Sequence, residues 1–273
     1  MELITDSREL KKIAFSRRID VLEMVTASKS GHIGGSMSCM DVLVSLYYGV
    51  MDVGKIIAGS PGRDRFILSK GHCAEALYAV LADRGFFPVE DLKTFGAFGT
   101  ALAEHPTRKI PGVEIATGAL GHGLPHGVGM AMGLAGASAN VYVLMGDGEL
   151  AEGSVWEGAM AAAKFKLGNL TAVIDRNLLQ ISGRTEDVMP LEDLAAKFSA
   201  FGWDVRSCNG HEPREIIRAL TDGRTRGKPL ALIAETIKGY GSPLTENKAE
   251  WHHMIPSVEQ YKEIKADLQR HIE

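Results

Sequence analysis

The second half of the chain alternates short, continuously apolar segments with longer segments of helical periodicity. The apolar segments are VYVLM at residues 141–145, LTAVID at 170–175 and PLALIAETI at 229–237, with the shorter WDVRS at 203–207. Strands buried on both faces are apolar throughout, and strands separated by helices pair in parallel. The pattern therefore predicts an α/β fold with a doubly wound, mostly parallel sheet.

The first half of the chain predicts helices, one strand and a long loop. Apolar residues at helical spacing predict helices, which we expect at residues 6–29, 40–48, 73–85, 127–137, 151–167, 191–202 and 212–224 and from Val258 onward. SGHIGGSM at 30–37 reads as a glycine-rich break between the first two helices, and RFILSKGH at 65–72 as a buried strand that runs into a turn. The Gly- and Pro-containing segment 96–118 is long for a structureless connection, which is typical of a functional loop.

Composition excludes several classes of protein. The chain has 30 Lys plus Arg against 34 Asp plus Glu, a net charge of −4, and no basic cluster, so we expect no nucleic-acid binding. Its apolar runs are too short to span a membrane, and its start lacks an apolar core of signal-peptide length. Cys39, Cys73 and Cys208 match no zinc or disulfide framework. We therefore expect a cytoplasmic protein and, because no linker interrupts the chain, one domain over residues 1–273.

The most informative motif is GDG, which directly follows the strand at 141–145 and is expected to open a helix. Asn177 directly follows the next strand of the alternation. Ligands of parallel sheets bind beyond the carboxyl ends of the strands, so we expect Asp147 and Asn177 to lie close together. A carboxylate, an amide oxygen and a backbone carbonyl make an oxygen site that suits Mg²⁺, and the glycines leave room for phosphates.

Two other interpretations of GDG remain open. GDGELA also fits the dinucleotide fingerprint, with Asp175 as the acid that binds the ribose. Asp147 would then place a negative charge against a metal-free pyrophosphate, whereas Mg²⁺ between them turns repulsion into coordination. The motif could also be a plain turn between a strand and a helix. The charge on Asp147 favours the Mg-diphosphate interpretation.

Several motifs together resemble transketolase, a family of thiamine-diphosphate enzymes. They occur in the family's order and cover nearly the whole chain: SGHIGGSMS, RFILSKGH, EHP, TGALGHG, GDGELAEGSVWE and NLLQISG. The resemblance implies a diphosphate-type thiamine-diphosphate-binding fold. A set of motifs like this is more specific than GDG and Asn177 alone.

The resemblance also implies roles for particular residues. The implied Mg²⁺ ligands are Asp147, Asn177 and the carbonyl of Leu179. The implied cofactor contacts are His72, Gly118, Leu120, Gly146, Gly148, Glu152 and Asn177. The implied catalytic residues are His32, His105, His252 and Glu152, the last of them near a subunit interface. WHHMIP leaves open whether His252 or His253 faces the site, although its likeness to a His-Gly-x-Pro stretch favours His252. We expect His126 and His211 to be structural or solvated.

The chain departs from the family at four positions and in length. Ile33, Lys70, Ala119 and His122 stand where Pro, Asn, Pro and Gln are usual, which puts the usual sugar-phosphate pair in doubt. Full transketolases continue into a pyrimidine-binding domain and a third domain. The resemblance therefore implies the N-terminal subunit of a split transketolase, which forms an α2β2 heterotetramer with a C-terminal subunit.

The expected function is ketol transfer with thiamine diphosphate and Mg²⁺. A two-carbon unit would pass from a ketose or ketose phosphate to an aldose or aldose phosphate, and only when the partner chain is present. The alternatives are another enzyme of this cofactor class, such as one similar to deoxyxylulose-phosphate synthase or a transketolase for an unusual sugar, and a non-catalytic cofactor-holding or regulatory subunit. Because Asp147, Asn177, His32 and His72 are all present, the sequence argues against a degenerate subunit.

Overall fold

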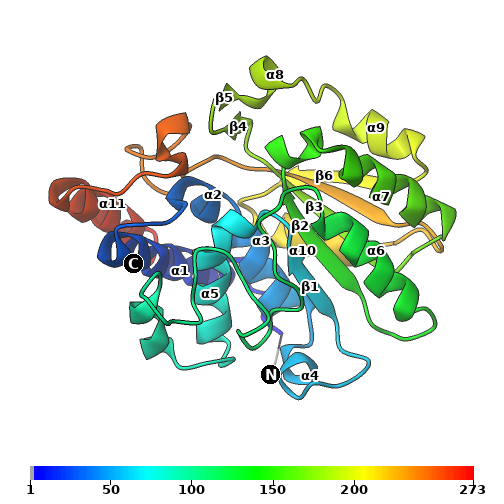
Figure 1. Ribbon diagram of the computed structural model, residues 1–273, viewed down its shortest axis with the longest axis horizontal. Helices are drawn as coiled ribbons and strands as arrows, with labels where there is room; N and C mark the ends of the chain where they lie inside the picture. Colours follow the sequence, from blue (N-terminus) through cyan, green and yellow to red (C-terminus); the bar gives the residue numbers. More distant parts are fainter. Residues whose placement is uncertain (1–2) are drawn as a thin grey trace.

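A five-stranded parallel sheet forms the centre of the computed structural model, which describes residues 3–273 (Figure 1). Its strands are β1 (Arg65–Leu68), β2 (Val141–Gly146), β3 (Leu170–Arg176), β6 (Asp204–Asn209) and β7 (Leu230–Glu235). They are ordered β1-β2-β3-β7-β6, and every neighbouring pair is parallel. The predicted α/β class and parallel sheet are confirmed.

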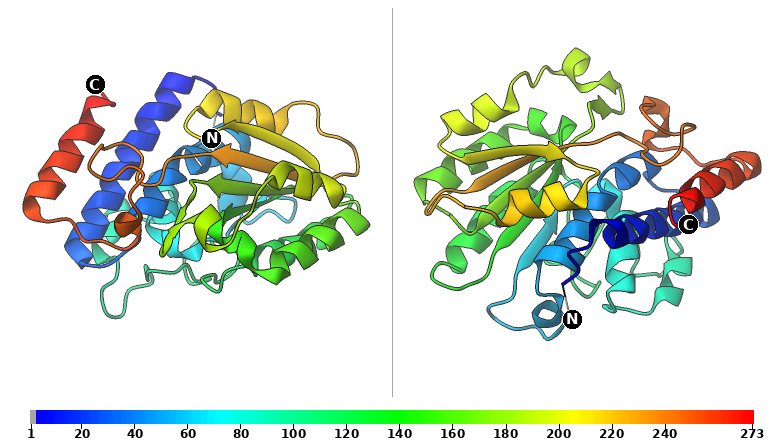
Figure 2. Two further views of the ribbon diagram at one scale, coloured as in Figure 1. Left: turned by 90° about the horizontal axis from the view of Figure 1, so that it is seen from above. Right: turned by 180° about the vertical axis from the view of Figure 1, so that it is seen from behind.

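Helices cover both faces of this sheet, as Figure 2 shows. On one face, α6 (Gly123–Gly133), α7 (Gly153–Lys164) and α9 (Leu194–Ala200) share a core with the strand residues Val141 and Val143. The other face is covered by α1 (Ser7–Ser28), α3 (Met40–Val44), α5 (Ala74–Asp83), α10 (Pro213–Thr221) and α11 (Val258–Arg270). Alternate residues along each strand therefore pack into two separate hydrophobic cores, which explains why the strands are apolar throughout.

Shorter elements complete the chain. The remaining helices are α2 (Ile33–Ser38), α4 (Val53–Ile57) and α8 (Thr185–Val188), and a small hairpin pairs β4 (Leu179–Gln180) with β5 (Gly183–Arg184). Turns of 3₁₀ type are η2 (Gly71–Cys73), η3 (Val89–Thr94), η4 (Gly148–Ala151) and η5 (Ala249–His252), and Ser45–Val50 (η1) is a π-helix. Among residues 3–273, no helix is both long and apolar enough to cross a membrane.

The ends and the buried face of helix α1 follow from its local sequence. The Asp6 carboxylate caps its first turn by accepting the Arg8 amide at 2.7 Å, and Lys29 ends it in a left-handed conformation at φ 57°. Leu10, Val21 and other apolar residues at helical spacing are fully buried. The predicted helix from Asp6 to Lys29 is therefore confirmed.

The glycine-rich segment 30–37 is not the irregular break that we expected. It contains α2, a short helix whose residues are all buried. A Cβ at Gly34 would lie 2.6 Å from the Trp251 carbonyl oxygen, and one at Gly35 would lie 2.8 Å from Cys73 Sγ. Close packing of this backbone therefore outweighs the low helix propensity of glycine.

Three other boundaries differ from the prediction. The helix expected at 40–48 is α3 followed by the π-helical turn, and the one expected at 127–137 begins four residues earlier, at Gly123. GDG does not open the long helix directly, because η4 intervenes before α7 begins at Gly153.

Candidate active site

The register of the sheet brings the functional motifs to one edge. Gly146 pairs with Asp175, and Asp175 with Ala234, so β2, β3 and β7 end side by side. A cavity of about 270 Å³ lies at this carboxyl edge. Of the predicted site residues, those that line it are His32, His72, Gly118, Leu120, Gly146, Asp147, Gly148, Asn177, Leu179 and His252.

The Asp147 side chain is fixed by donors around it and is only 1% exposed. Its Oδ1 accepts the Gly148 amide at 2.7 Å, and its Oδ2 accepts the Leu178 amide at 2.7 Å and Arg176 Nη1 at 3.2 Å. Burial, together with the nearby charge of Asp175, raises the pKa of Asp147. A cation beside this carboxylate would relieve both effects.

Asn177 and Leu179 supply oxygen atoms to the same cavity. Asn177 donates its amide to Asp175 Oδ2 at 3.1 Å, and its Oδ1 accepts the Leu179 amide at 3.1 Å. Between them, Leu178 adopts a left-handed conformation with φ 66°. The strained backbone therefore turns sharply where the amide oxygen and the Leu179 carbonyl reach the cavity.

These oxygen donors fit Mg²⁺, and the glycines beside them fit a diphosphate. A carboxylate, an amide oxygen and a peptide carbonyl are the hard ligands that this ion prefers. A Cβ added at Gly148 would crowd Gln180, whose Oε1 would lie 3.1 Å away, whereas one at Gly146 would meet only Lys70 Cβ at 3.9 Å. The three oxygen donors lie together as the sequence predicts, and the binding of Mg²⁺ and a diphosphate here stays a prediction.

Lys238 is a site residue that the sequence did not reveal. It lines the cavity although it is only 2% exposed, and its Nζ lies 3.0 Å from His252 Nδ1 and 3.4 Å from the Leu179 carbonyl. Burial, and then the charge of Lys70, lowers the pKa of Lys238 to about 8. A buried cation here favours an anionic ligand. Its position just after β7, at the edge where β2 and β3 also end, was the available signal.

Asp175 cannot play the part that the dinucleotide interpretation requires. Its carboxylate is fully buried and accepts hydrogen bonds from Lys70, from Thr236 and, at 2.6 Å, from Ser38. Burial opposes ionisation, but the Lys70 ammonium outweighs it and holds the pKa of Asp175 below its usual range. The ion pair with Lys70 therefore occupies the Asp175 carboxylate, which would otherwise have to bind a ribose. Lys70, one of the departures from the family, is thus a core partner as well as a cavity residue.

Four imidazoles surround His32. Its ring centroid lies 5.3 Å from that of His72, 6.0 Å from His105, 5.5 Å from His252 and 4.7 Å from His253. Burial lowers the pKa of His32 to about 4 and that of His252 to about 3. Both rings are therefore neutral near pH 7, so each can donate one hydrogen bond and accept another.

His105 and Glu152 are predicted site residues that do not line the cavity. The His105 ring lies behind the His32 ring, which lines the cavity, and packs against Gly118. Gly118 has φ 138°, a conformation that disfavours a side chain at this position. Glu152 is exposed and lies beside Gly121 at the start of α7, outside the cavity lining, and its contact with the cofactor stays a prediction. The turn η4 carries its side chain outward. The other expectation, a role at a subunit interface, remains a prediction.

Glu149 is the glutamate that turns inward. It is 2% exposed, lines the cavity, and accepts the Gly121 amide at 2.9 Å, the Gly146 amide at 3.1 Å and the Ser69 hydroxyl. It therefore ties the TGALGHG loop to the GDG turn. Nothing in the periodicity of GELAEG distinguished it from Glu152, because the 3₁₀ turn that orients it was not predicted.

The remaining histidines lie outside the cavity. His211 is buried, with Nδ1 2.9 Å from Asp41 Oδ2, which agrees with the predicted structural role. His126 is exposed on α6, as expected. His122 is also exposed, at the position before α6, and does not line the cavity.

The fold and the cavity define a class of protein, in which the carboxyl edge of a parallel sheet binds a phosphate-bearing ligand. Comparison with known proteins identifies the family. Residues 10–270 match the family "Transketolase, thiamine diphosphate binding domain". The chain belongs to the transketolase family and corresponds to the N-terminal, thiamine-diphosphate-binding subunit of these transferases.

Individual relatives refine this assignment. The chain is 50% identical over 256 residues to an apulose-4-phosphate transketolase subunit of Phocaeicola vulgatus, covering 93% of this chain and 91% of that protein. It is 41% identical to "6-deoxy-6-sulfo-D-fructose transketolase subunit SqwG" of Clostridium sp., over 91% of this chain and 92% of that protein. The crystal structure of transketolase from Campylobacter jejuni superimposes with a TM-score of 0.87 at 31% identity, covering 95% of this chain but 42% of that one.

Proposed function

We propose that this chain binds Mg²⁺ and the diphosphate of thiamine diphosphate within a two-chain transketolase. Asp147, Asn177 and the Leu179 carbonyl hold the metal, while His72 and Lys238 face the diphosphate. When bound, thiamine diphosphate supplies the carbon that carries a two-carbon ketol unit. The observation that carries this proposal is the convergence of the three oxygen donors with these two side chains in one cavity.

In this proposal the histidines of the cluster around His32 bind the sugar substrate and not the metal. His32 and His252 line the cavity as neutral imidazoles and hydrogen-bond the oxygens of the ketose. His105 lies behind His32 and orients it or reaches the substrate from the loop before Pro106. A neutral ring suits this task, because it can donate to one oxygen and accept from the next.

The proposed substrates are a ketose or ketose phosphate as donor and an aldose or aldose phosphate as acceptor. The names of two relatives, which refer to apulose 4-phosphate and 6-deoxy-6-sulfo-D-fructose, support an unusual sugar rather than the common pentose-phosphate pair.

The proposed partner is a C-terminal subunit that carries the pyrimidine-binding domain, in an α2β2 assembly. The chain spans 42% of the Campylobacter transketolase, and three of its relatives are themselves named as single subunits of transketolases, which implies a second chain. Residues 1–273 then form one diphosphate-binding domain. Glu152, exposed beside Gly121, would meet the partner at this interface.

Capture of the tagged chain from its native lysate, with Mg²⁺ and thiamine diphosphate present, tests the proposal. We expect native mass spectrometry to find equal numbers of this chain and a second one, with cofactor bound, and the complex to transfer ketol units from a panel of ketoses. Products of pyruvate condensation would instead indicate an enzyme similar to deoxyxylulose-phosphate synthase. A complex that binds the cofactor but transfers nothing would indicate a regulatory role.

A further inference from the structure

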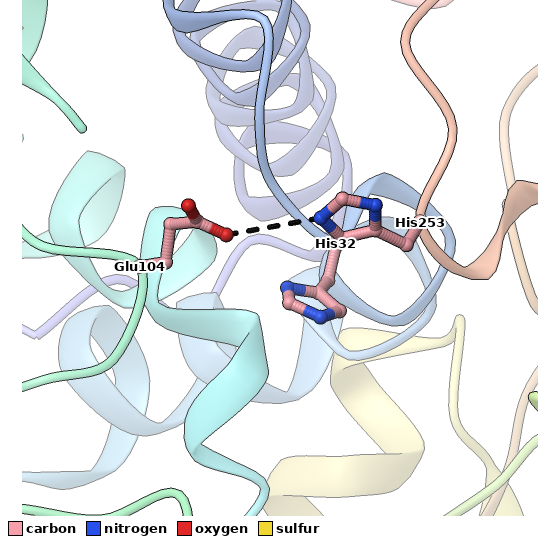
Figure 3. A group of neighbouring side chains, drawn as sticks. All are labelled: His32, Glu104 and His253. Atoms are coloured by element: carbon pink, nitrogen blue, oxygen red, sulfur yellow. Dashed lines mark ion pairs between the residues drawn. The ribbon is translucent and has the colours of Figure 1, made fainter.

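Two side chains that the proposed mechanism does not use meet beside His32. Glu104 comes from the loop that precedes His105, and His253 from the turn that follows η5 (Figure 3). Their facing atoms, Glu104 Oε2 and His253 Nε2, lie 3.8 Å apart. One ligand atom from each of Glu104, His253 and His32 lies within 4.8 Å of the others. Two distant segments thus add a carboxylate and an imidazole to the histidine cluster.

The pair lies next to the cavity and remains accessible. His32 lines the cavity, and the His253 ring stands edge-on to it at 4.7 Å, but neither Glu104 nor His253 lines the cavity itself. Their side chains are 35% and 49% exposed, respectively. A molecule that extends from the cavity past His32 would therefore meet these two groups.

We propose that Glu104 and His253 form a specificity-determining pair that binds a hydroxyl group of the ketose donor and disfavours an anionic group at that position. This inference rests on the proposed function and names a feature of its substrate. It concerns the carbon of the donor that is bonded to the ketone on the side away from the transferred two-carbon unit.

The hydrogen-bonding state of the pair suits a hydroxyl group. Glu104 Oε1 accepts the Ser30 hydroxyl at 2.5 Å, which holds the carboxylate in place. The distance of 3.8 Å between Oε2 and His253 Nε2 is too long for a hydrogen bond, so both atoms are free to bind one group that lies beside the pair. A sugar hydroxyl can donate to the carboxylate and accept from the imidazole at once.

The charge of Glu104 explains the proposed discrimination. A carboxylate and a second anion repel one another when they approach in a partly desolvated site, whereas a neutral hydroxyl gains a charge-assisted hydrogen bond. The fold does not require the pair, because exposed ion pairs contribute only about 0–1 kcal/mol to stability. A role in substrate selection accounts for its position better than a role in folding.

The test uses the reconstituted two-chain enzyme and two donors that differ in charge beside the ketone. L-Erythrulose carries a neutral hydroxyl-bearing carbon there, and hydroxypyruvate carries a carboxylate. For Glu104→Gln we expect the ratio of kcat/KM for erythrulose to that for hydroxypyruvate to fall roughly ten- to a hundredfold. His253→Asn should lower the same ratio through KM. The affinity for thiamine diphosphate should stay unchanged in both variants.

Glu263→Gln is the matched control, because Glu263 is exposed on α11 and belongs neither to the cavity lining nor to the group around His32. In this control variant the ratio of kcat/KM for erythrulose to that for hydroxypyruvate should equal the wild-type ratio. Equal losses for both donors, or no change in Glu104→Gln, would overturn the inference. Tight binding of Zn²⁺ to the wild type that disappears in Glu104→Gln would also overturn it, since the three side chains would then be a metal site. Wild-type enzyme that transfers from no donor would instead refute the proposed function.

Discussion

At the scale of single residues, Asp147 combines burial with hydrogen bonds that point its oxygens at the cavity. Asp147→Asn keeps the shape of the side chain and removes its charge. We expect the assembled enzyme to lose more than about a hundredfold in Mg²⁺-dependent affinity for thiamine diphosphate, because even changes in residues behind a metal ligand cost about 10–100-fold. Isothermal titration calorimetry measures this.

Asp187→Asn is the control for that change, since Asp187 is 73% exposed on α8. It should bind the cofactor as the wild type does. Unchanged affinity in Asp147→Asn would remove Asp147 from the metal site.

His32 should act on turnover and not on cofactor binding. His32→Ala removes a neutral imidazole that lines the cavity, and we expect kcat to fall about a hundredfold or more, as for the loss of a positioned proton-transfer group. The cofactor affinity should change little, because the oxygen donors remain. Steady-state kinetics with a fluorescence titration of the cofactor separate the two effects, and a fully active variant would exclude His32 from the site.

Glu75 links the site to the pH dependence of stability. It is fully buried, its Oε1 accepts the His32 amide, and burial together with Cys73 raises its pKa to about 8. An acid whose pKa is higher in the folded state stabilises the fold while protonated, and this contribution is lost as pH rises from about 4.5 to about 8. The loss is on the order of 4 kcal/mol.

Glu75→Gln should remove this dependence while keeping an acceptor for the His32 amide. We expect the variant to gain stability relative to the wild type as pH rises from 5 to 8, with little difference at pH 5. Urea denaturation at several pH values measures the difference in free energy of unfolding between the variant and the wild type. A difference in free energy of unfolding that stays constant with pH would show that Glu75 does not titrate in this range.

At the scale of elements, the contact between α6 and β2 depends on a glycine. A Cβ at Gly127 would lie 2.5 Å from Val143 Cγ2, whereas one at Gly129, on the same helix, would meet nothing within 4 Å. We expect Gly127→Ala to destabilise the protein by about 1–3 kcal/mol through overpacking. Gly129→Ala should stabilise it by about 0.5–1 kcal/mol through helix propensity. Thermal unfolding compares them, and equal effects would disprove the close packing of α6 on the sheet.

At the scale of the whole molecule, Glu152 and Leu178 are exposed close to residues of the cavity lining in the sequence, and we propose that the partner subunit covers them. The chain alone should therefore show no ketol transfer, even with Mg²⁺ and thiamine diphosphate in excess. Adding the purified partner chain should restore turnover, with activity rising until the two chains are equimolar. Turnover by the isolated chain, measured by product formation from a ketose, would refute the two-chain proposal.

The sequence by itself determined the parallel sheet and the side chains at its edge. Continuous apolar strands define buried β-structure wherever they occur, and residues directly after such strands must reach the same edge, so Asp147 and Asn177 could be placed together. Periodicity and capping likewise determined α1 from Asp6 to Lys29. These inferences succeed because they depend on residues near one another in sequence or on a rule of sheet topology.

Only the tertiary structure decided which polar residues turn inward. Glu149 faces the cavity and Glu152 faces outward because a 3₁₀ turn separates them, and Lys238 reaches the site because β7 lies beside β3. The glycine-rich segment 30–37 became helical because its backbone packs against Trp251 and Cys73. Glu104 and His253 meet only when two loops about 150 residues apart in sequence converge on His32. Contacts between distant segments depend on how the whole chain packs, and no local pattern of residues encodes them.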